Sequence, residues 1–433
     1  MKIAFFTPLN PLKSGISDFC EELLPYLKEE MEVDLFIEEY KPTNIEIKNS
    51  FKIRRISEFE NEAVRKEYDQ VIYQIGNNET CHESIYNMAL KYPGIIELHD
   101  ISLHHMLAAT TIARGDVEKY KSIMEYCHGI GAVQEVDKFL RSEILPPWEN
   151  NSLIFTVNKE LIDSAKGVIV HSDYAKQMVK GVRSDVPIEV IYLHADEIDT
   201  NYIDSKMMAR EQLGLLQEEL IFATFGFITK PKRILETLEV LKVIKEKGYK
   251  FKFYIVGKVA DQLNVTEVIK QNNLEDEVVV TGFVTLEKMK QLMKASDICF
   301  CLRYPTQGES SAIVHRLLGM GKIMFVTNVG TFSEYPDDVA IKINIEHETE
   351  EMIEKILYFL QNKDEARAYE AKALEFAIQY CTLSANAKMY KAFIENLSIW
   401  EETDVEEMIA EAFYALNIRD EEVIRKVINY EIK

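Results

Sequence analysis

Short apolar segments alternate with helix-length amphipathic segments along most of this chain, and this alternation is the feature that most restricts its fold. Segments 2–8, 32–37, 70–76 and 94–100 are rich in β-branched and aromatic residues, and helical patterns lie between some of them. This rhythm is typical of βαβ units, in which parallel strands form a sheet with helices on both faces. We therefore expect a doubly wound α/β domain at the start of the chain.

A second series of strand-like segments begins near residue 218, after a polar helical stretch at 199–219. Its members lie at 219–227, 250–258, 277–283, 297–305, 322–328 and 339–344. Because a chain of 433 residues exceeds the size of one ordinary core, two or three domains are expected. We assign an N-terminal Rossmann-like domain to 1–208, a second Rossmann-like domain to 209–385, and helices packed back on the body to 386–433.

The net charge of −22, from 72 acidic and 50 basic residues, restricts the partners of the chain. Such a surface repels nucleic acid and anionic lipid, so we expect no nucleic-acid partner and at most a weak peripheral contact with a membrane. No apolar run is long enough to span a bilayer, and the six scattered cysteines show no zinc-site spacing. A cytoplasmic location is the expectation that follows, with residues 2–8 as a first strand rather than part of a signal peptide.

Ligands of doubly wound domains bind at the carboxyl ends of the strands, so the residues that follow each strand are the candidates for a site. Ser14 and Gly15 stand between the first strand and a helix, where backbone amides can face an anion or a hydroxyl-rich ligand. An ordinary helix cap by Ser14 or Ser17 explains them equally well. Asn77 and Asn78 follow a third strand and offer donors and acceptors to a polar ligand, although both also favour turns.

His99 and Asp100 end another expected strand, and His104 and His105 follow within a few residues. A histidine at this edge can hydrogen-bond a ligand hydroxyl or exchange a proton, whereas a single histidine is more often structural. Four titratable groups in so short a segment favour the functional interpretation. A metal site built from the three histidines with His128 or Asp100 lacks a recognised ligand spacing, so we expect no metal.

In the second domain, Lys230, Lys232 and Arg233 place three positive charges directly after the first strand. Lysines are common in solvated loops. A phosphate, however, binds well between the end of a strand and the start of a helix, and in so acidic a chain this position favours an anionic ligand.

A later strand-to-helix loop of the second domain carries Arg303, Glu309, Ser310 and Ser311. Free amides and hydroxyls at this helix start can hold a diphosphate with help from Arg303. The Glu309 carboxylate repels phosphate and suits a hydroxyl group, unless it merely complements the helix dipole. Glu334 occupies a similar position after the next strand.

Together these residues resemble a known family. The SGISDF and LHD segments of the first domain and the GFITKPKR segment of the second are similar to the GT-B retaining glycosyltransferases of family 4 (group 1). The most specific part is the block RYPTQGESSAIVHRLLGMGKIMFVTNVGTFSEYPDD at 303–338. The similarity covers roughly residues 1–390.

The resemblance implies transfer of a sugar from a nucleotide diphosphate-sugar to a glycan, lipid-linked or protein acceptor, with retained configuration and no metal or cofactor. Lys232 corresponds to the family's phosphate-binding lysine, His99 to the histidine near the transferred sugar, and Ser14-Gly15 to the loop after the first strand. We assign His99 and Glu309 to catalysis. The expected donor-binding residues are Ser14, Gly15, Lys232, Arg233, Arg303, Ser310, Ser311, Arg316 and Glu334, and the expected acceptor-side residues are Asn77, Asn78, Asp100 and His104.

The sequence departs from the family pattern at two positions. Phe227 follows the glycine of the first strand in the second domain, where the family usually has an arginine. The family also commonly has two glutamates with seven residues between them, the second of which binds the ribose. Counting back from Gly321 places Gly308 and Arg316 at these positions, whereas counting forward from Glu309 places Leu317 at the second, so the second glutamate is absent either way. The ribose contact is therefore expected to differ, which leaves the nucleotide open.

Two alternative functions stay open on the sequence. The same two-domain architecture hosts sugar-nucleotide epimerases, which consume a nucleotide sugar without an acceptor. A non-catalytic, glycosyltransferase-like binding subunit would account for both departures from the family pattern.

Overall fold

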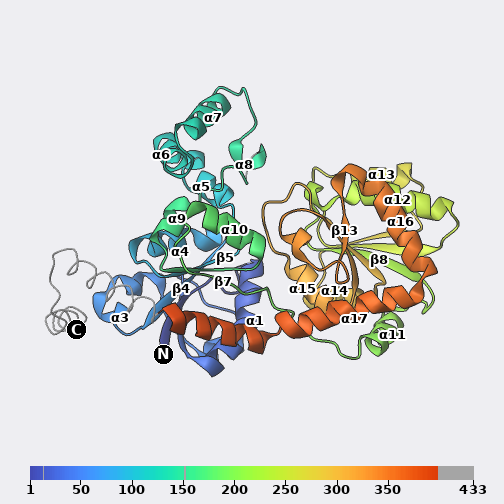
Figure 1. Cartoon of the computed structure of the whole chain (residues 1–433), viewed down its shortest axis with the longest axis horizontal. Helices are drawn as coiled ribbons and strands as arrows, with labels where there is room; N and C mark the ends of the chain where they lie inside the picture. Colours follow the sequence, from blue (N-terminus) through green and yellow to red (C-terminus); the bar gives the residue numbers. More distant parts are fainter. Residues whose placement is uncertain (13, 151–152, 398–433) are drawn as a thin grey trace, which may run out of the picture.

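Two parallel β-sheets, each in its own domain, form the framework of the computed structural model (Figure 1). The structure describes residues 1–12, 14–150 and 153–397. The prediction of two Rossmann-like domains with a helical C-terminal extension is confirmed.

The N-terminal sheet has seven parallel strands in the order β3-β2-β1-β4-β5-β6-β7. The strands are β1 (Lys2–Phe6), β2 (Glu32–Ile37), β3 (Lys52–Arg55), β4 (Gln70–Ile75), β5 (Ile95–Leu98), β6 (Gly167–Val170) and β7 (Ile188–Val190). The strand order reverses between β1 and β4, so the loops after these two strands diverge and leave a crevice at the carboxyl edge.

Helices cover both faces of this sheet, and two apolar clusters form the core on either side of it. The main covering helices are α1 (Gly15–Glu30), α2 (Ile45–Ser50), α3 (Glu62–Arg65), α4 (Glu79–Lys91), α9 (Lys159–Ser164) and α10 (Asp173–Val182), with the 3-10 helix η1 (Ile56–Glu60). A further group projects from the domain (Figure 1): α5 (His104–Thr110), η2 (Ile112–Arg114), α6 (Val117–His128), α7 (Ile130–Leu140) and α8 (Pro147–Asn150).

The second sheet has six parallel strands in the order β10-β9-β8-β11-β12-β13, with its reversal between β8 and β11. The strands are β8 (Leu220–Phe225), β9 (Phe251–Val256), β10 (Val278–Gly282), β11 (Ile298–Cys301), β12 (Ile323–Thr327) and β13 (Ile341–Ile343). The helices are α11 (Tyr202–Leu213), η3 (Lys230–Lys232), α12 (Ile234–Glu246), α13 (Val265–Gln271), α14 (Leu286–Ala295), α15 (Ala312–Gly319), η4 (Gly330–Glu334), η5 (Ile345–His347) and α16 (Glu348–Gln361).

The C-terminal segment returns from the second domain to the first. Helix α17 (Lys363–Tyr380) lies beneath the second domain in Figure 1, and residues 383–397 form a further helix beneath the first domain. Apolar side chains of that last helix, Tyr390 and Ile394 among them, are buried in the core of the N-terminal domain. The predicted packing of 386–433 can thus be followed as far as residue 397, and residues 398–433 lie outside the described residues.

None of the helices in the described part of the chain has both the length and the apolar content that a membrane-spanning segment requires.

Candidate functional site

A cavity of about 300 Å³ is lined by loops that follow strands of both sheets. It sits at the reversal of strand order in the first domain, where residues after β1 and β4 face residues after β5 and β6. The second domain closes it with Ser310 and Ala312. The predicted site residues that line this cavity are Ser14, Gly15, Asn77, Asn78, His99, Asp100 and Ser310.

Several of these residues also stabilise the loops in which they lie. Ser14 caps α1, since its side chain accepts a hydrogen bond from the Ile16 amide at 3.2 Å, and Asn78 caps α4 in the same way. The Asn77 amide donates to Asp100 at 2.8 Å. Burial raises the pKa of Asp100 to about 6. The first-domain wall is therefore preorganised rather than loose.

Both ring nitrogens of His99 have protein partners. Its Nε2 lies 2.6 Å from Gln74 Oε1 on β4, and its Nδ1 lies 3.0 Å from His171 Nε2 at the end of β6. His171 Nδ1 in turn lies 2.8 Å from the Ile191 carbonyl. Both nitrogens of His99 are therefore occupied by protein groups, and the ring presents its edge and face to the cavity.

A buried carboxyl group lies behind His99. Glu97 on β5 is 0 % exposed and hydrogen-bonds the Gln74 amide and the Tyr390 hydroxyl of the last helix. Burial raises the pKa of Glu97 to about 7. Burial also lowers the pKa of His171 to about 4 and that of His99 well below its usual range.

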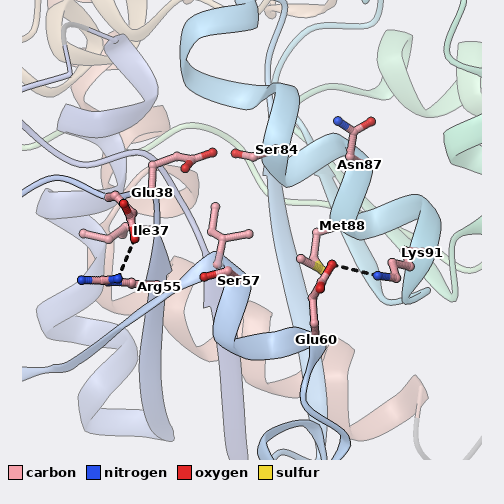
Figure 2. Close-up of a pocket in the computed structure, with 11 residues that line it drawn as sticks. Ile37, Glu38, Arg55, Ser57, Glu60, Ser84, Asn87, Met88 and Lys91 are labelled. Carbon is pink, nitrogen blue, oxygen red and sulfur yellow. Dashed lines mark hydrogen bonds and ion pairs between the residues drawn. The ribbon is translucent and has the colours of Figure 1, made fainter.

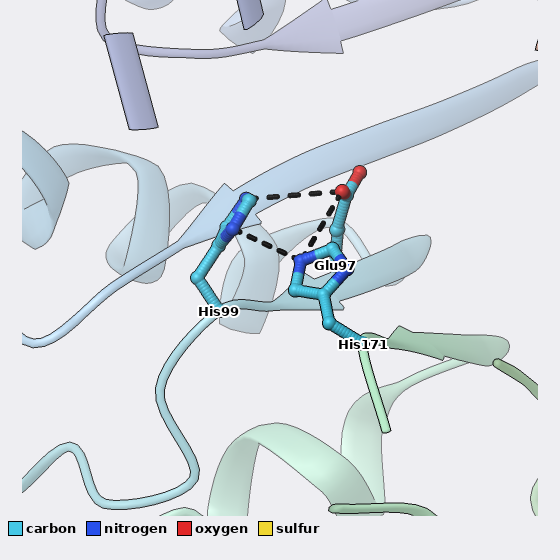
Figure 3. Close-up of side chains that lie close together, drawn as sticks. All are labelled: Glu97, His99 and His171. Atoms are coloured by element: carbon cyan, nitrogen blue, oxygen red, sulfur yellow. Dashed lines mark hydrogen bonds and ion pairs between the residues drawn. The ribbon is translucent and has the colours of Figure 1, made fainter. Parts of the chain in front are cut away.

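Glu97, His99 and His171 are close enough to suggest a metal site (Figure 3). The geometry disfavours a shared ion, because His99 presents Nδ1 to His171 but Nε2 to Glu97, and one imidazole cannot offer both nitrogens to one metal. The facing histidine nitrogens are 3.0 Å apart, which is shorter than the roughly 3.3 Å that tetrahedral zinc coordination gives. We assign these contacts to hydrogen bonding.

Lys232 and Arg303 provide the positive charge of the second domain, after β8 and β11. The Lys232 ammonium hydrogen-bonds the Phe225 carbonyl, and burial together with the nearby Arg303 lowers the pKa of Lys232 to about 7. Arg303 Nε lies 2.9 Å from Glu309 Oε1. The two cations follow the two strands between which the strand order of the second sheet reverses. The cavity of the first domain lies at the equivalent point of the first sheet.

Glu309 is held within its own loop. Its second oxygen accepts hydrogen bonds from the Thr306 hydroxyl at 3.0 Å and the Gln307 amide at 2.7 Å. Ser310 reaches the other domain, with its hydroxyl 3.4 Å from the His171 carbonyl. Ser311 stands at the N-cap position of α15 without a side-chain capping bond.

Arg233 and His104 have partners outside the cavity. The Arg233 guanidinium pairs with Glu348 at 2.6 Å and Glu236 at 2.8 Å. His104 is buried with its Nε2 2.7 Å from the Tyr120 hydroxyl, and burial lowers its pKa to about 3.

Arg316 and Glu334 bridge the domains. Arg316 pairs with Glu22 of α1 at 2.8 Å and with Asp196 at 2.6 Å. The Glu334 carboxylate accepts hydrogen bonds from the Asp173 amide at 2.9 Å and from the Tyr174 amide, at the N-terminus of α10. Both residues hold the domains together in this structure.

Sequence reasoning missed His171 and His82, which also line the cavity, and Glu97 behind it. His171 directly follows β6, so the rule that pointed to His99 would have found it. Glu97 lies within β5, where a buried polar residue gives no signal of its own in a strand pattern.

A second cavity, of about 560 Å³, lies at the ends of β2 and β3 in the first domain (Figure 2). Its lining combines charged and polar side chains with apolar surface from Ile37, Ile56 and Met88. Two ion pairs lie at its edge: Arg55–Glu39 at 2.6 Å and Lys91–Glu60 at 2.8 Å. Helix α4 connects the two cavities, since Asn78 at its start lines the first and Asn87 lines the second.

The second domain of this chain matches a protein-family model. Residues 206–376 match the family described as Glycosyl transferases group 1. This chain carries a group 1 glycosyl transferase domain. The prediction of a glycosyltransferase is confirmed at this level. No curated protein sequence matches the chain.

Several solved structures share the fold of most of this chain. Sucrose-phosphate synthase from Thermosynechococcus elongatus aligns with a TM-score of 0.64 at 14% identity, covering 92% of this chain and 99% of that one. Anabaena Alr3699/HepE in complex with UDP gives 0.64 at 14% identity, covering 92% and 100%. WaaG, a glycosyltransferase involved in lipopolysaccharide biosynthesis, gives 0.59 at 12% identity, covering 90% and 99%. At these identities the likeness shows a common GT-B fold.

Proposed function

We propose that this chain transfers a sugar from a nucleotide diphosphate-sugar to a hydroxyl group of a glycan, lipid-linked or protein acceptor, with retained anomeric configuration and without a metal. The observation that carries the proposal is the cavity between the two sheets, which is lined by residues from both domains at the reversal of strand order. The match to the group 1 family supports it, because the matched residues 206–376 include Ser310, which lines the cavity, and the cations Lys232 and Arg303.

The chemistry consists mainly of charge stabilisation. The bond between the anomeric carbon and the diphosphate oxygen breaks, and its electron pair stays on the departing phosphate. The acceptor oxygen bonds the same face of the sugar and gives its proton to the departing phosphate oxygen. Lys232 and Arg303 stabilise the negative charge that develops there, which is the task a metal performs in other phosphate sites.

Three predicted residues have narrower roles in this proposal. The Ser310 hydroxyl and the start of α15 lie beside the diphosphate. The Glu309 carboxylate is fixed by its own loop and orients Arg303. Both of its oxygens are used by these contacts, so we expect little direct hydrogen bonding from Glu309 to the sugar. His99 offers its neutral ring to the sugar from the opposite domain.

A uridine diphosphate sugar is the donor to test first. Alr3699/HepE, which shares this fold, has been solved with UDP and with UDP-glucose. Counted back from Gly321, Arg316 stands where the family has its ribose-binding acid, and its guanidinium pairs with Glu22 and Asp196. The ribose hydroxyls must therefore be bound by other groups, so guanosine and adenosine diphosphate sugars belong in the same panel.

The acceptor binds on the first domain in this proposal. The second cavity, beside α4, lies at the same carboxyl edge of the sheet as the donor-facing cavity. Its charged and hydroxyl side chains can hydrogen-bond an acceptor, and its apolar surface can pack against a sugar ring or a lipid. We place the part of the acceptor that is distant from the reacting hydroxyl there.

The experiment follows the release of nucleotide diphosphate from each donor, with and without glycan and lipid-linked acceptors, in the presence of EDTA. We expect release with one donor only when an acceptor is present. Conversion of the donor without an acceptor would favour an epimerase instead. Absence of any release and of any donor binding would refute the proposed function.

A further inference from the structure

Hydrogen bonds form an unbroken chain through the interior of the first domain, from Ile191 to the last helix. In order, the members are the Ile191 carbonyl, His171, His99, Gln74, Glu97 and the Tyr390 hydroxyl. Gln74 and Glu97 are register partners on neighbouring strands, so their side chains share one face of the sheet. The number of protons in this chain can be counted because each link needs one donor and one acceptor.

The count starts at Ile191, whose carbonyl can only accept, so His171 must carry a proton on Nδ1. If His171 is neutral, its Nε2 is an acceptor and His99 must donate from Nδ1. A neutral His99 then accepts at Nε2, so the NH₂ end of Gln74 faces it. The carbonyl oxygen of Gln74 consequently faces Glu97, which must supply a proton of its own.

Two alternative distributions use the same number of protons. Gln74 can donate to an ionised Glu97 and accept from His99 Nε2, which is the orientation of the amide in the structure. In one of them His99 Nδ1 is an acceptor and His171 is an imidazolium with protons on both nitrogens. In the other His99 is the imidazolium and donates from both nitrogens, to His171 and to Gln74. The distributions differ in which residue, Glu97 or a histidine, carries one extra proton. If that proton is removed, two acceptors face each other, which costs the desolvation energy of an unpaired buried group.

We propose that Glu97 is a positioning residue that keeps this extra proton, so that His99 and His171 stay neutral and His99 is fixed with its proton on Nδ1. The Glu97 hydroxyl donates to Gln74 after a half-turn of the amide, and the other Glu97 oxygen accepts from Tyr390. The neutral form avoids a separated pair of charges in the interior, where His171 Nε2 and Glu97 Oε1 are 3.7 Å apart.

The surroundings of Glu97 favour the protonated form. The titratable groups that face it are Tyr390 from the last helix, His99, His171 and Cys20 of α1. No lysine or arginine within ion-pair distance of Glu97 is found among the described residues. Burial raises the pKa of Glu97 and lowers the pKa of both histidines, which is the direction that this distribution requires.

The consequence for catalysis rests on the proposed function. A neutral His99 beside the transferred sugar does not oppose the positive charge that develops on the anomeric carbon, whereas an imidazolium at this position would. Tyr390 connects the last helix to this network, because its hydroxyl donates a hydrogen bond to Glu97, whose protonation determines the tautomer and charge of His99.

Glu97→Gln provides the test, because its amide reproduces the donor and the acceptor of a protonated carboxyl group. We expect the variant to fold and, at neutral pH, to keep its stability. Infrared spectra of the wild type minus the variant, at about pH 6, should show the carbonyl stretch of an un-ionised carboxyl group. A difference spectrum with carboxylate bands alone, or a Glu97→Gln chain that fails to fold, would overturn the proposal.

The pH dependence of unfolding gives a second readout that needs no activity. The folded pKa of Glu97, about 7, lies above the roughly 4.3 of an unfolded glutamate. The stabilising contribution is therefore complete below the unfolded pKa and is lost as pH rises to about 7. Wild type should lose stability relative to Glu97→Gln over this range with a slope of one proton, and parallel curves would overturn the proposal.

Tyr390→Phe is the matched control, because it removes a neighbouring hydroxyl and leaves the proton count unchanged. It should retain the un-ionised carboxyl band. Failure of the whole chain to bind any nucleotide sugar would refute the proposed function without affecting either readout on Glu97.

Discussion

Lys232 is a half-buried cation whose ammonium hydrogen-bonds the Phe225 carbonyl and whose close charged neighbour is another cation, Arg303. Such an arrangement is unfavourable without a ligand and becomes favourable when a diphosphate supplies the missing negative charge. We expect Lys232→Ala to lower kcat/KM for the donor by about 10²–10³-fold, as loss of a group that stabilises transition-state charge does elsewhere. Steady-state kinetics would measure this.

The control for that variant is Lys230→Ala, which changes an exposed lysine of the same loop. It should leave kcat/KM nearly unchanged. Equal losses in both variants would mean that general attraction by the loop, and no specific contact, holds the donor.

The depressed pKa of Lys232 predicts a pH dependence of donor affinity. Above about pH 7 the free protein loses the Lys232 charge, so donor binding must take up a proton and the dissociation constant should rise with pH. Lys232→Arg, which stays charged, should show a flat profile over the same range. Calorimetric titrations at several pH values would measure both, and a flat wild-type profile would contradict the assignment.

At the scale of elements, Arg316 joins α15 to α1 and to the segment between the domains. Its side chain is 9% exposed and lies between the carboxylates of Glu22 and Asp196. Arg316→Met should lower the free energy of unfolding by about 2–4 kcal/mol, because two partly buried carboxylates lose the guanidinium and keep one partner each, His194 for Glu22 and Lys290 for Asp196.

Urea unfolding monitored by circular dichroism would measure the Arg316 effect. Arg141→Met removes an arginine whose pairing with Glu143 is exposed, and it should change the free energy of unfolding by less than about 1 kcal/mol. Similar values for the two variants would show that the Arg316 pairs are no stronger than a surface ion pair.

Helix α4 links the two cavities of the first domain, which leads to a prediction about the acceptor. Asn87→Trp adds bulk at an exposed position of the second cavity. It should raise the KM for a long acceptor by about tenfold or more and leave donor affinity unchanged, since roughly 1.4 kcal/mol of lost contact is tenfold. Lys48→Trp on α2, exposed and outside both cavities, is the control, and equal acceptor KM values would contradict this placement.

The strands were predictable because the spacing and composition of their apolar residues identify buried parallel strands. The candidate site residues were predictable because the carboxyl ends of parallel strands meet at one edge of the sheet. Ser14, Asn77, His99 and Ser310 accordingly line one cavity. The partners of the long charged side chains were not predictable.

Arg233, for example, binds Glu348, which lies 115 residues further along the chain. Arg316 binds Glu22 from 294 residues away. Local pattern carries no information on such pairs, so both arginines were assigned to the donor on sequence position alone. Their roles toward the donor stay predictions.

At the scale of the whole molecule, Glu334 connects the domains by accepting amide hydrogen bonds at the start of α10, and Ser172 and Thr331 add a contact at 3.2 Å. Glu334→Ala should shift the population toward an open cleft by about tenfold, because a charged acceptor at a helix N-terminus contributes roughly 1–2 kcal/mol. Small-angle X-ray scattering should show a larger radius of gyration, which nucleotide would reverse.

Asp337→Ala is the matched control for the domain contact, since that carboxylate is 91% exposed and pairs with Lys342 within its own domain. Its scattering curve should match the wild type. A Glu334→Ala curve identical to both would show that the contact does not hold the cleft closed.

Binding of a nucleotide diphosphate-sugar in the cleft is the central claim, and calorimetry tests it most directly. Wild type and Lys232→Ala are titrated with UDP-glucose and with guanosine and adenosine diphosphate sugars, in EDTA. We expect one donor to bind wild type with one site per chain, and the variant to bind it at least tenfold more weakly, a loss of about 1.4 kcal/mol. Wild type that binds none of these donors, or a variant that binds as tightly as wild type, would contradict the claim.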